Sequence, residues 1–545
     1  MDVTTSSDDA RTTILLVVGT GGFTHAAPVL ELGRILAKRG HIIQFATHQG
    51  QQKWVEGNPA YSFISQVYTM GDPMSAQKEE AHYLHIQQTD PRVSYMEYFR
   101  PKFTVDAFWT SDYACLQRIV QESLPDMILA DFFVDAARDI GLQYCIPVAM
   151  VWPQMPYGMV GASYIPGLPG FQVDALTSET ASIWTRIRAA LRPIRAARAT
   201  LSYLRFVRDM RRGSGVHYAL KKLGKPDYLV LVNSFWGLET PKDLPPLVAA
   251  VGPILSDEYP DLDDLTMSFF AVHTRVVYVS FGTHVQVPPD YLERILGALV
   301  RHLDEGTIDG IIWAANKAQL GLFPRSQILG ESKVIVDDIL SDRDPHWLFT
   351  PFAPQRAILD RPQTVLFVTH GGGSSVNEAT FHGTPMLSLG FFFDQPLNGL
   401  RIQEAGVGLF LDKAAFTQIE VYEKTRALLK DENGMTAKNV QRMRHIAQIS
   451  SRKKEFAADL IQEMLYDHKY NLAVQTGSGR RRQRPMHLET ADARMSAWRA
   501  QNWDLTCMGL LVIGGVVAMA TAGIKCLRAY MALRAAGGWT HGQPG

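Results

Sequence analysis

Cysteine is scarce in this chain of 545 residues, and Cys115, Cys145, Cys507 and Cys526 form no CxxC pair or Cys/His cluster. The sequence therefore excludes a zinc site or a disulfide framework as the basis of the fold. Net charge is also lacking, because 54 Lys and Arg residues balance 54 Asp and Glu residues. We expect no nucleic-acid partner, since such partners are recognised by a strong excess of basic charge.

The N-terminal residues MDVTTSSDDARTT lack the basic region and cleavage site of a secretory signal, so we expect none. Near the other end, residues 505–524 contain no charged side chain and are long enough to cross a membrane as a helix. More basic residues flank this segment on its N-terminal side than on its C-terminal side, and those on the N-terminal side are arginines. The positive-inside bias then predicts a single-pass C-terminal anchor in the endoplasmic reticulum or another endomembrane, with the large N-terminal part in the cytoplasm.

Apolar, β-rich runs alternate with amphipathic helical stretches twice along the chain, which is typical of parallel sheets covered by helices. We predict an α/β fold with two doubly wound, Rossmann-like domains facing across a cleft, followed by a transmembrane helix. The predicted strands lie at 14–18, 42–47, 126–131, 148–150, 275–282, 310–315, 365–370, 385–389 and 407–411. The predicted divisions are 1–255, a linker at 256–272, 273–470, a basic linker at 471–504, the span at 505–524 and a tail at 525–545.

One segment of the first half is strongly basic. Residues 186–222 contain eleven Lys and Arg residues and a single acid, Asp209, with apolar residues at helical spacing. Two interpretations stay open: a solvated basic face on a core helix, or a helix that lies on anionic lipid.

The stretch LLVVGTGGFTHAAP, residues 15–28, passes from a predicted strand into a glycine-rich turn, and we expect its helix to start at Pro28. A dinucleotide-binding loop needs a third glycine, where this chain has Thr24, and an acid at the end of the second strand, where it has Thr47. An oxidoreductase is therefore excluded. What remains is His25 at the carboxyl end of a parallel sheet, with Asp131 at the end of another predicted strand. This pair is suited to a general base held by a carboxylate.

The second half contains its own ligand-binding pattern in residues 352–398. The predicted strand VLFVTH ends at His370 and is followed by GGGSS and a predicted helix. Such a helix N-terminus, with the hydroxyls of Ser374 and Ser375, predicts a diphosphate site. Glu378, one turn into the helix, is placed for ribose hydroxyls, and Asp394 with Gln395 combines acceptors and donors for sugar hydroxyls.

This stretch resembles the signature of the UDP-dependent glycosyltransferases of family 1, which have the GT-B fold. The intervals of 8 residues from His370 to Glu378 and 16 from Glu378 to Asp394 match that family. The resemblance implies that His370 contacts the diphosphate, Glu378 the ribose, and Asp394 with Gln395 the transferred sugar. NSFWGLE (233–239) and VGP (251–253) also resemble family landmarks. The remaining donor contacts implied are Thr283, Phe352, Gln355, Gly372, Ser374 and Ser375.

Three positions depart from the family pattern. Phe352 stands where many plant members have Trp, Ser374 where Asn is frequent, and Gly390 where Pro is usual. The first keeps a smaller ring for stacking on the base. Ser374 removes an amide contact, and Gly390 leaves the sugar-binding loop more flexible.

The resemblance implies inverting transfer of a hexose, with UDP-glucose as the leading donor, to a hydroxyl of a lipophilic acceptor such as a sterol, lipid or secondary metabolite. His25 would act as general base and Asp131 would stabilise its charged form. We expect no metal or other cofactor, and we interpret the DLD at 261–263 as a solvated loop. The expected partners are the UDP-sugar, the acceptor and membrane lipid. A non-catalytic sugar-nucleotide-binding membrane protein of the same fold is the alternative.

Overall fold

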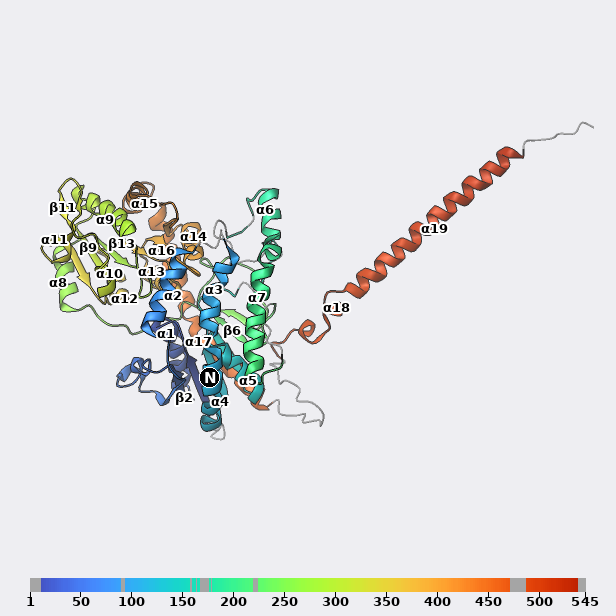
Figure 1. Cartoon of the computed structure of the whole chain (residues 1–545), viewed down its shortest axis with the longest axis horizontal. Coiled ribbons are helices and arrows are strands. Elements are labelled where there is room, and N and C mark those ends of the chain that lie inside the picture. The colour runs from blue at the N-terminus through green and yellow to red at the C-terminus, as the bar shows by residue number, and fades with distance from the viewer. Residues whose placement is uncertain are drawn as a thin grey trace, which may run out of the picture. The chain divides into compact units, whose positions relative to one another are not determined.

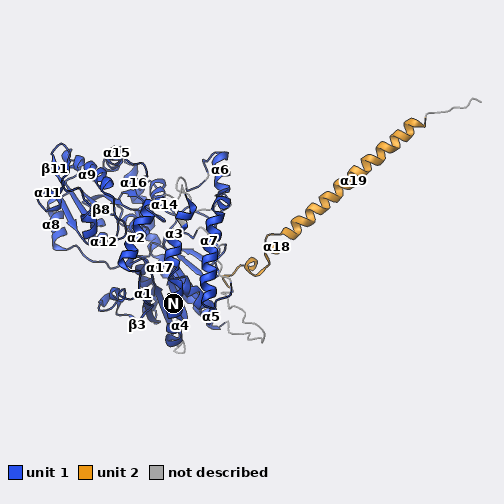
Figure 2. Cartoon of the chain, viewed as in Figure 1, with its two compact units in different colours: residues 1–485 blue, residues 486–545 orange. Residues whose placement is uncertain are grey.

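The structure is a computed structural model that describes residues 11–89, 94–156, 159–162, 164–166, 176–177, 179–218, 224–470 and 487–537. The chain falls into two compact units, residues 1–485 and 486–545 (Figure 2). Parts of three predicted segments lie outside the described residues: 219–223 of the basic segment, 471–486 of the basic linker and 538–545 of the tail.

The N-terminal half of unit 1 is built on a seven-stranded sheet in the order β3-β2-β1-β4-β5-β6-β7, and every pairing in it is parallel. The strands are β1 Thr13–Val18, β2 Ile42–Thr47, β3 Ile64–Thr69, β4 Met127–Asp131, β5 Val148–Trp152, β6 Leu229–Val232 and β7 Val248–Ala250. Its helices are α1 Phe23–Lys38, α2 Ala76–Gln88, α3 Tyr95–Asp106, α4 Trp109–Ser123, α5 Asp135–Tyr144, α6 Ile183–Ala190 and α7 Arg192–Gly213, with short 3-10 turns η1 Gln52–Trp54 and η2 Pro59–Tyr61.

The C-terminal half of unit 1 has a six-stranded parallel sheet in the order β12-β9-β8-β13-β14-β15. The strands are β8 Val276–Ser280, β9 Gly310–Ala314, β12 Trp347–Thr350, β13 Thr364–Thr369, β14 Met386–Leu389 and β15 Gly408–Leu411, and β10 Ile328–Leu329 pairs antiparallel with β11 Val334–Ile335. The helices are α8 Asp264–Val272, α9 Pro289–Asp304, α10 Lys317–Leu320, α11 Val336–Leu340, α12 Gln355–Leu359, α13 Gly373–His382, α14 Gln395–Glu404, α15 Gln418–Lys430, α16 Met435–Ser451 and α17 Lys453–Tyr470. Helices lie against both sheets (Figure 1).

The last helix of unit 1, α17, returns from the C-terminal half to pack on α1 of the N-terminal half. The buried Lys454 ammonium donates to Glu31 at 2.8 Å and to Asp257 at 2.7 Å. Arg39, the C-cap residue of α1, donates to Glu455 at 2.8 Å. This return adds contacts between the two halves of the unit.

The predicted fold class is confirmed, since all nine predicted strands are present in two parallel sheets. The sequence patterns missed β3, β6, β7 and β12. Three of these, β3, β7 and β12, are edge strands. Edge strands bury fewer side chains and are short, so their apolar signal is weak. The predicted linker 256–272 contains α8, and Asp263 of the DLD stretch accepts a hydrogen bond from the Thr266 amide at 2.7 Å as its N-cap.

Unit 2 contains η3 Ala491–Arg494, α18 Ala497–Ala500 and the long helix α19 Trp503–Ala536. α19 includes the predicted span 505–524 and has no residue buried within the protein. By length and composition α19 can cross a membrane, and it is the one such helix among the described residues.

Candidate active site

The two residues predicted to form the base lie together because their strands are neighbours. β1 and β4 pair in parallel, so both end at the same edge of the sheet. His25 follows β1 in the first turn of α1, and Asp131 is the last residue of β4. His25 Nδ1 lies 3.0 Å from Asp131 Oδ1. Topology thus joins two residues that are 106 positions apart in the chain.

The pair is held in place by the two residues that follow β4. The second Asp131 oxygen accepts a hydrogen bond from the Phe133 amide at 3.0 Å. The His25 ring stacks on Phe133 with centroids 4.9 Å apart and on Phe132 at 5.6 Å. The Asp131 side chain is 3% exposed and that of His25 is 21% exposed. With Nδ1–H donated to the carboxylate, Nε2 is the nitrogen left to accept a proton.

The electrostatics favour a basic imidazole. Burial by itself lowers the pKa of His25. The charge of Asp131, its hydrogen bond to the ring and the charge of Asp394 outweigh burial, so the pKa is raised above its usual 6.5. The site therefore combines a buried carboxylate with a histidine that accepts a proton more readily than a free one.

The glycines before His25 leave room for its imidazole ring. The helix begins at Phe23, so the prediction that Pro28 starts it is wrong: Pro28 lies inside α1 and His25 is on the helix itself. Gly22 is the N-cap with φ +76°, and Gly21 has φ +111°. A Cβ atom at Gly21 would lie 2.5 Å from the His25 ring. The turn needs glycine both for its left-handed backbone and for room beside the imidazole.

The predicted donor residues gather at one edge of the second sheet. β8 pairs with β13 and β13 with β14, so the loops after these three strands are neighbours. They contain Thr283, His370 and Asp394 respectively. The His370 ring lies between two glycine backbones, since a Cβ at Gly282 would be 3.0 Å from it and one at Gly372 would be 2.5 Å. Burial lowers the pKa of His370 to about 4, so at neutral pH this ring is uncharged.

The helix after His370 presents its N-terminus at the same edge. Gly372 is the N-cap of α13, and Ser374 and Ser375 lie in its first turn. On this helix Glu378 Oε2 accepts a hydrogen bond from the Gln355 amide at 2.7 Å, and the same amide donates to Ser375 Oγ at 3.3 Å. Burial raises the pKa of Glu378. Gln355 thus joins α12 to α13 and orients the carboxylate.

Asp394 and Gln395 differ in what they can offer a ligand. Asp394 Oδ2 accepts from Asn398 Nδ2 at 2.8 Å, and burial raises the pKa of this carboxyl group. Gln395 Oε1 accepts from the backbone amides of Phe391 at 3.0 Å and Phe392 at 3.2 Å. The carbonyl oxygen of Gln395 therefore holds its own loop, and its NH₂ group is the donor that remains for a ligand.

Two predicted donor residues are more peripheral. Phe352 is 75% exposed and Thr283 is also exposed. An exposed aromatic ring at the end of β12 is available for stacking, with its backbone oxygen fixed by Thr350 Oγ1 at 2.6 Å.

The two halves of unit 1 meet at these residues. A Cβ at Gly373, where α13 begins, would lie 3.6 Å from Asp394 and 3.7 Å from Pro153, which follows β5 of the first sheet. A Cβ at Gly22 would lie 3.5 Å from the ring of His284 in the loop after β8. The glycine turn before His25 therefore faces the edge of the second sheet where the predicted donor residues gather.

A buried polar network between the halves was not predicted. Arg401 of α14 is 2% exposed and lies 2.9 Å from Glu239 of the first half. Its guanidinium also donates to Gln154 at 3.2 Å and to Asn398 at 2.8 Å. Asn398 in turn holds Asp394. No spacing rule links these residues; the only signal was that Glu239 ends the landmark NSFWGLE.

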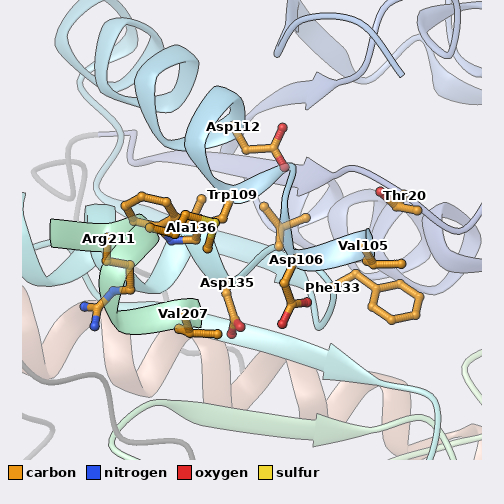
Figure 3. A pocket seen from close by; sticks show the side chains of 12 residues that line it. Thr20, Val105, Asp106, Trp109, Asp112, Phe133, Asp135, Ala136, Val207 and Arg211 are labelled. Carbon is orange, nitrogen blue, oxygen red and sulfur yellow. The ribbon is translucent and has the colours of Figure 1, made fainter. Parts of the chain in front are cut away.

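A pocket in the first half was also missed, because its lining comes from separate helices. Three carboxylates line it, each beside a partner: Asp106 lies 2.9 Å from Lys102, Asp112 2.8 Å from His48, and Asp135 3.7 Å from Arg138. The pocket is bounded by the loops after β1 and β4 and by α3, α4, α5 and α7 (Figure 3). It is lined by Thr20, Val105, Asp106, Trp109, Asp112, Phe133, Val134, Asp135, Ala136, Val207, Met210 and Arg211.

Comparisons with known proteins identify the family of the chain. A family model described as "UDP-glucoronosyl and UDP-glucosyl transferase" matches residues 218–449. The chain is similar to UDP-glycosyltransferase FPY2 of Fusarium mangiferae, at 38% identity over 92% of this chain and 96% of that protein. It is also similar to a UDP-glycosyltransferase of Talaromyces amestolkiae, at 39% identity over 90% and 93% of the two chains. A solved UDP-glucosyltransferase from Polygonum tinctorium has the same fold, with a TM-score of 0.56, 17% identity and coverage of 84% and 99%.

Proposed function

Because the chain belongs to the family of UDP-glucuronosyl and UDP-glucosyl transferases, we propose that it transfers a hexose from UDP-glucose to a hydroxyl of a lipophilic small molecule. Transfer of a sugar from a UDP-sugar follows from family membership. The hexose, the acceptor and the residue roles are the proposal. The observation that carries it is the His25–Asp131 pair, 3.0 Å apart, next to a glycine turn that faces the predicted donor residues of the second sheet.

The proposed reaction is an inverting displacement. Nε2 of His25 takes the proton of the acceptor hydroxyl, and the oxygen attacks the anomeric carbon from the face opposite the diphosphate. The bond from that carbon to the diphosphate oxygen breaks, and UDP leaves with the electron pair. Asp131 stabilises the imidazolium that forms. A raised pKa of His25 supports this role because it strengthens the base.

We assign the donor site to the edge that contains His370, Glu378 and Asp394. The N-terminus of α13 offers backbone N–H groups and a positive dipole end to the diphosphate. His370, uncharged because burial lowers its pKa to about 4, adds a neutral N–H donor. Glu378 accepts from the ribose, and Asp394 with the NH₂ group of Gln395 binds the sugar. These hydrogen-bond donors would stabilise the negative charge that develops on the leaving diphosphate without a metal ion.

We place the acceptor on the first half of unit 1 beside His25, at the loops after β1 and β4, whose Thr20 and Phe133 also line the pocket of Figure 3. The pocket itself has a free volume of about 10 Å³, which holds about one water, so the acceptor would contact its rim and not enter it. We further propose that α19 anchors the protein in an endomembrane with unit 1 in the cytoplasm. The excess of arginine before the span supports that orientation.

The experiment is His25→Ala with two readouts. We expect turnover of UDP-glucose with a panel of sterol, lipid and phenolic acceptors to fall by about 10²–10⁴-fold, because the base is lost. The Kd of UDP, measured by calorimetry, should stay unchanged. His346→Gln, at an exposed histidine bonded to the Asp309 carbonyl, is the matched control and should keep full turnover. Equal turnover in the His25→Ala variant would refute the assigned base. A wild-type chain that binds UDP but glycosylates nothing would support the non-catalytic alternative.

A further inference from the structure

Two consecutive helices of unit 1, α6 and α7, leave large apolar side chains in solvent. On α6, Ile183 is 63% exposed and Trp184 is 71% exposed, and on α7 Ile194 is 72% exposed. Both helices run along one side of unit 1 (Figure 1). A cluster of exposed apolar side chains of this size on a folded protein marks an interaction surface. The outward apolar set is Ile183, Trp184, Ile187, Leu191, Ile194 and Leu201.

The exposed side of α7 is not part of any core. Ala196, Ala199, Tyr203 and Val207 form its buried side, which packs on α3 and the rest of the first half. At 100° per residue, Ile194 and Leu201 lie on the opposite side. On α6, Ala189 alone is buried. Within the part of the chain that the structure describes, the most exposed of these side chains, Ile183, Trp184 and Ile194, therefore contribute little to packing.

The same surface is strongly basic. Between residues 183 and 213 the chain has nine arginines and one acid, Asp209. Arg198, Arg205 and Arg212 are exposed, and on the helical wheel they fall beside Ile194 and Leu201. We call this combined set of outward apolar residues and arginines on α6 and α7 the basic-apolar face.

We propose that the basic-apolar face lies on a bilayer that contains anionic lipid, with Ile183, Trp184 and Ile187 in the interfacial region. A second copy of this chain is disfavoured, because the contact would bring two sets of arginines together. Anionic headgroups instead complement the arginines, while the acyl boundary takes up the apolar side chains. Tryptophan beside arginine is typical of residues at the membrane–water interface.

This contact gives α7 two functional sides. Its inner side contributes Val207, Met210 and Arg211 to the pocket of Figure 3, and its outer side lies on the membrane. A lipophilic molecule in the bilayer would thus have one helix between itself and the pocket. The membrane contact does not depend on the identity of that molecule or on the transferase chemistry, and it can be tested without an activity assay.

The test uses the full chain reconstituted in lipid nanodiscs. A polarity-sensitive fluorophore is attached to Ile187→Cys in a background where the exposed Cys145, Cys507 and Cys526 are serine. The nanodiscs contain phosphatidylcholine alone or phosphatidylcholine with phosphatidylserine. We expect a blue shift, and quenching by spin-labelled lipid, in the anionic discs and much less of either in the neutral discs.

Two matched controls complete the test. A label at Val272→Cys, on an exposed apolar residue of α8 in the acidic stretch around Asp263, should show no shift. Replacing Arg198, Arg205 and Arg212 by Glu should lower the ratio of bilayer-bound to free Ile187 label by about 100-fold, since each of the three basic residues near an anionic surface contributes about fivefold. Replacing the exposed cations Arg361, Lys430 and Lys438 by Glu should leave that ratio unchanged.

Circular dichroism establishes that each variant is folded before it is compared. A blue shift confined to anionic discs and lost in the triple variant supports the proposal. No shift in either disc overturns it, and so does a shift of equal size in both. A shift that grows with protein concentration assigns the basic-apolar face to protein–protein contact and also overturns it.

Discussion

At the scale of single residues, the proposed chemistry depends on which nitrogen of His25 carries a proton. The carboxylate of Asp131 fixes the proton on Nδ1 and leaves Nε2 as the acceptor. The same carboxylate raises the pKa of the ring against the effect of burial. A base works in its deprotonated form, so turnover should fall as pH drops through this raised pKa.

Asp131→Asn should therefore change both the rate and the pH profile. Without the negative charge, burial lowers the pKa of His25, so the acid limb of kcat/KM should move to lower pH. The plateau should fall by about 10²–10⁴-fold, because the imidazolium loses its partner and the tautomer is no longer fixed. Steady-state kinetics between pH 5 and 9 measure both effects; that range spans about two pH units on either side of neutrality.

The control for this profile is a second histidine–carboxylate pair. His382 Nδ1 lies 2.9 Å from Asp360 in the C-terminal half. Asp360→Asn should leave the acid limb in place. An acid limb that stays fixed in the Asp131 variant, or moves in the Asp360 variant, would contradict the assignment of the base.

Replacing Glu378 by Gln should weaken UDP binding without lowering the stability of the fold. Burial raises the pKa of this carboxyl group in the folded chain, so ionisation opposes folding and the loss of stability grows as pH rises. Glu378→Gln should then leave the melting temperature unchanged or higher. The variant loses a charged acceptor for the ribose, so the Kd of UDP should rise by about 10- to 100-fold.

Calorimetry with UDP and thermal unfolding at pH 7 measure the two effects. Glu404→Gln, at an exposed carboxylate of α14, is the control and should change neither. Tight UDP binding by the Glu378 variant would remove this residue from the donor site.

At the scale of elements, Gly21 and Gly22 form the turn before α1 and leave room for the His25 imidazole. Gly21→Ala forces a left-handed backbone on alanine and places a Cβ 2.5 Å from the His25 imidazole. Gly50→Ala imposes a similar strain, at φ +83°, where no atom lies within 4 Å. Both variants should lose about 1–2 kcal/mol of unfolding free energy.

Only Gly21→Ala should also lose turnover, because only there must the His25 ring, the proposed base, shift. Thermal unfolding and kcat, measured side by side for the two variants, separate the effects. If kcat falls equally in both, backbone strain rather than the position of the imidazole controls the rate.

The order of strands decided which predictions about elements succeeded. His25 and Asp131 could be paired from the sequence because buried parallel strands give clear apolar runs, and their carboxyl ends meet at one edge. The start of α1 was misplaced because proline is common in the first turn of a helix, whereas here the glycine turn leads directly into Phe23. Gln395 Oε1 accepts a hydrogen bond from the Phe391 amide of its own loop. This bond depends on the backbone geometry of the loop, which no residue pattern encodes.

At the scale of the whole molecule, Arg401 joins the two halves near Asp394 and Gln395, the residues proposed to bind the sugar. Arg401→Met should leave Glu239 buried without this cation and lower the free energy of unfolding by about 3–5 kcal/mol. The double variant Glu239→Gln/Arg401→Met removes both charges and should lose clearly less. Denaturant unfolding of the two variants measures this difference.

A positioning role adds a kinetic consequence. Arg401 holds Asn398, which holds Asp394, so both variants should raise the KM of the UDP-sugar more than they lower kcat. Restoring stability in the double variant without restoring KM would separate positioning from folding. Normal KM in both variants would leave Arg401 with a structural role alone.

Two parallel sheets, the glycine and serine motif after β13, the apolar span and the pairing of His25 with Asp131 can all be predicted from the residues alone. These features are local or follow from the edge rule of parallel sheets, so periodicity and spacing reveal them. Features that depend on surfaces meeting across the chain become visible only in the folded molecule. The Arg401–Glu239 pair, the pocket behind the His25 loop and the outward exposure of Ile183, Trp184 and Ile194 are of this kind. Burial and contact between distant segments arise from packing, which a single sequence does not show.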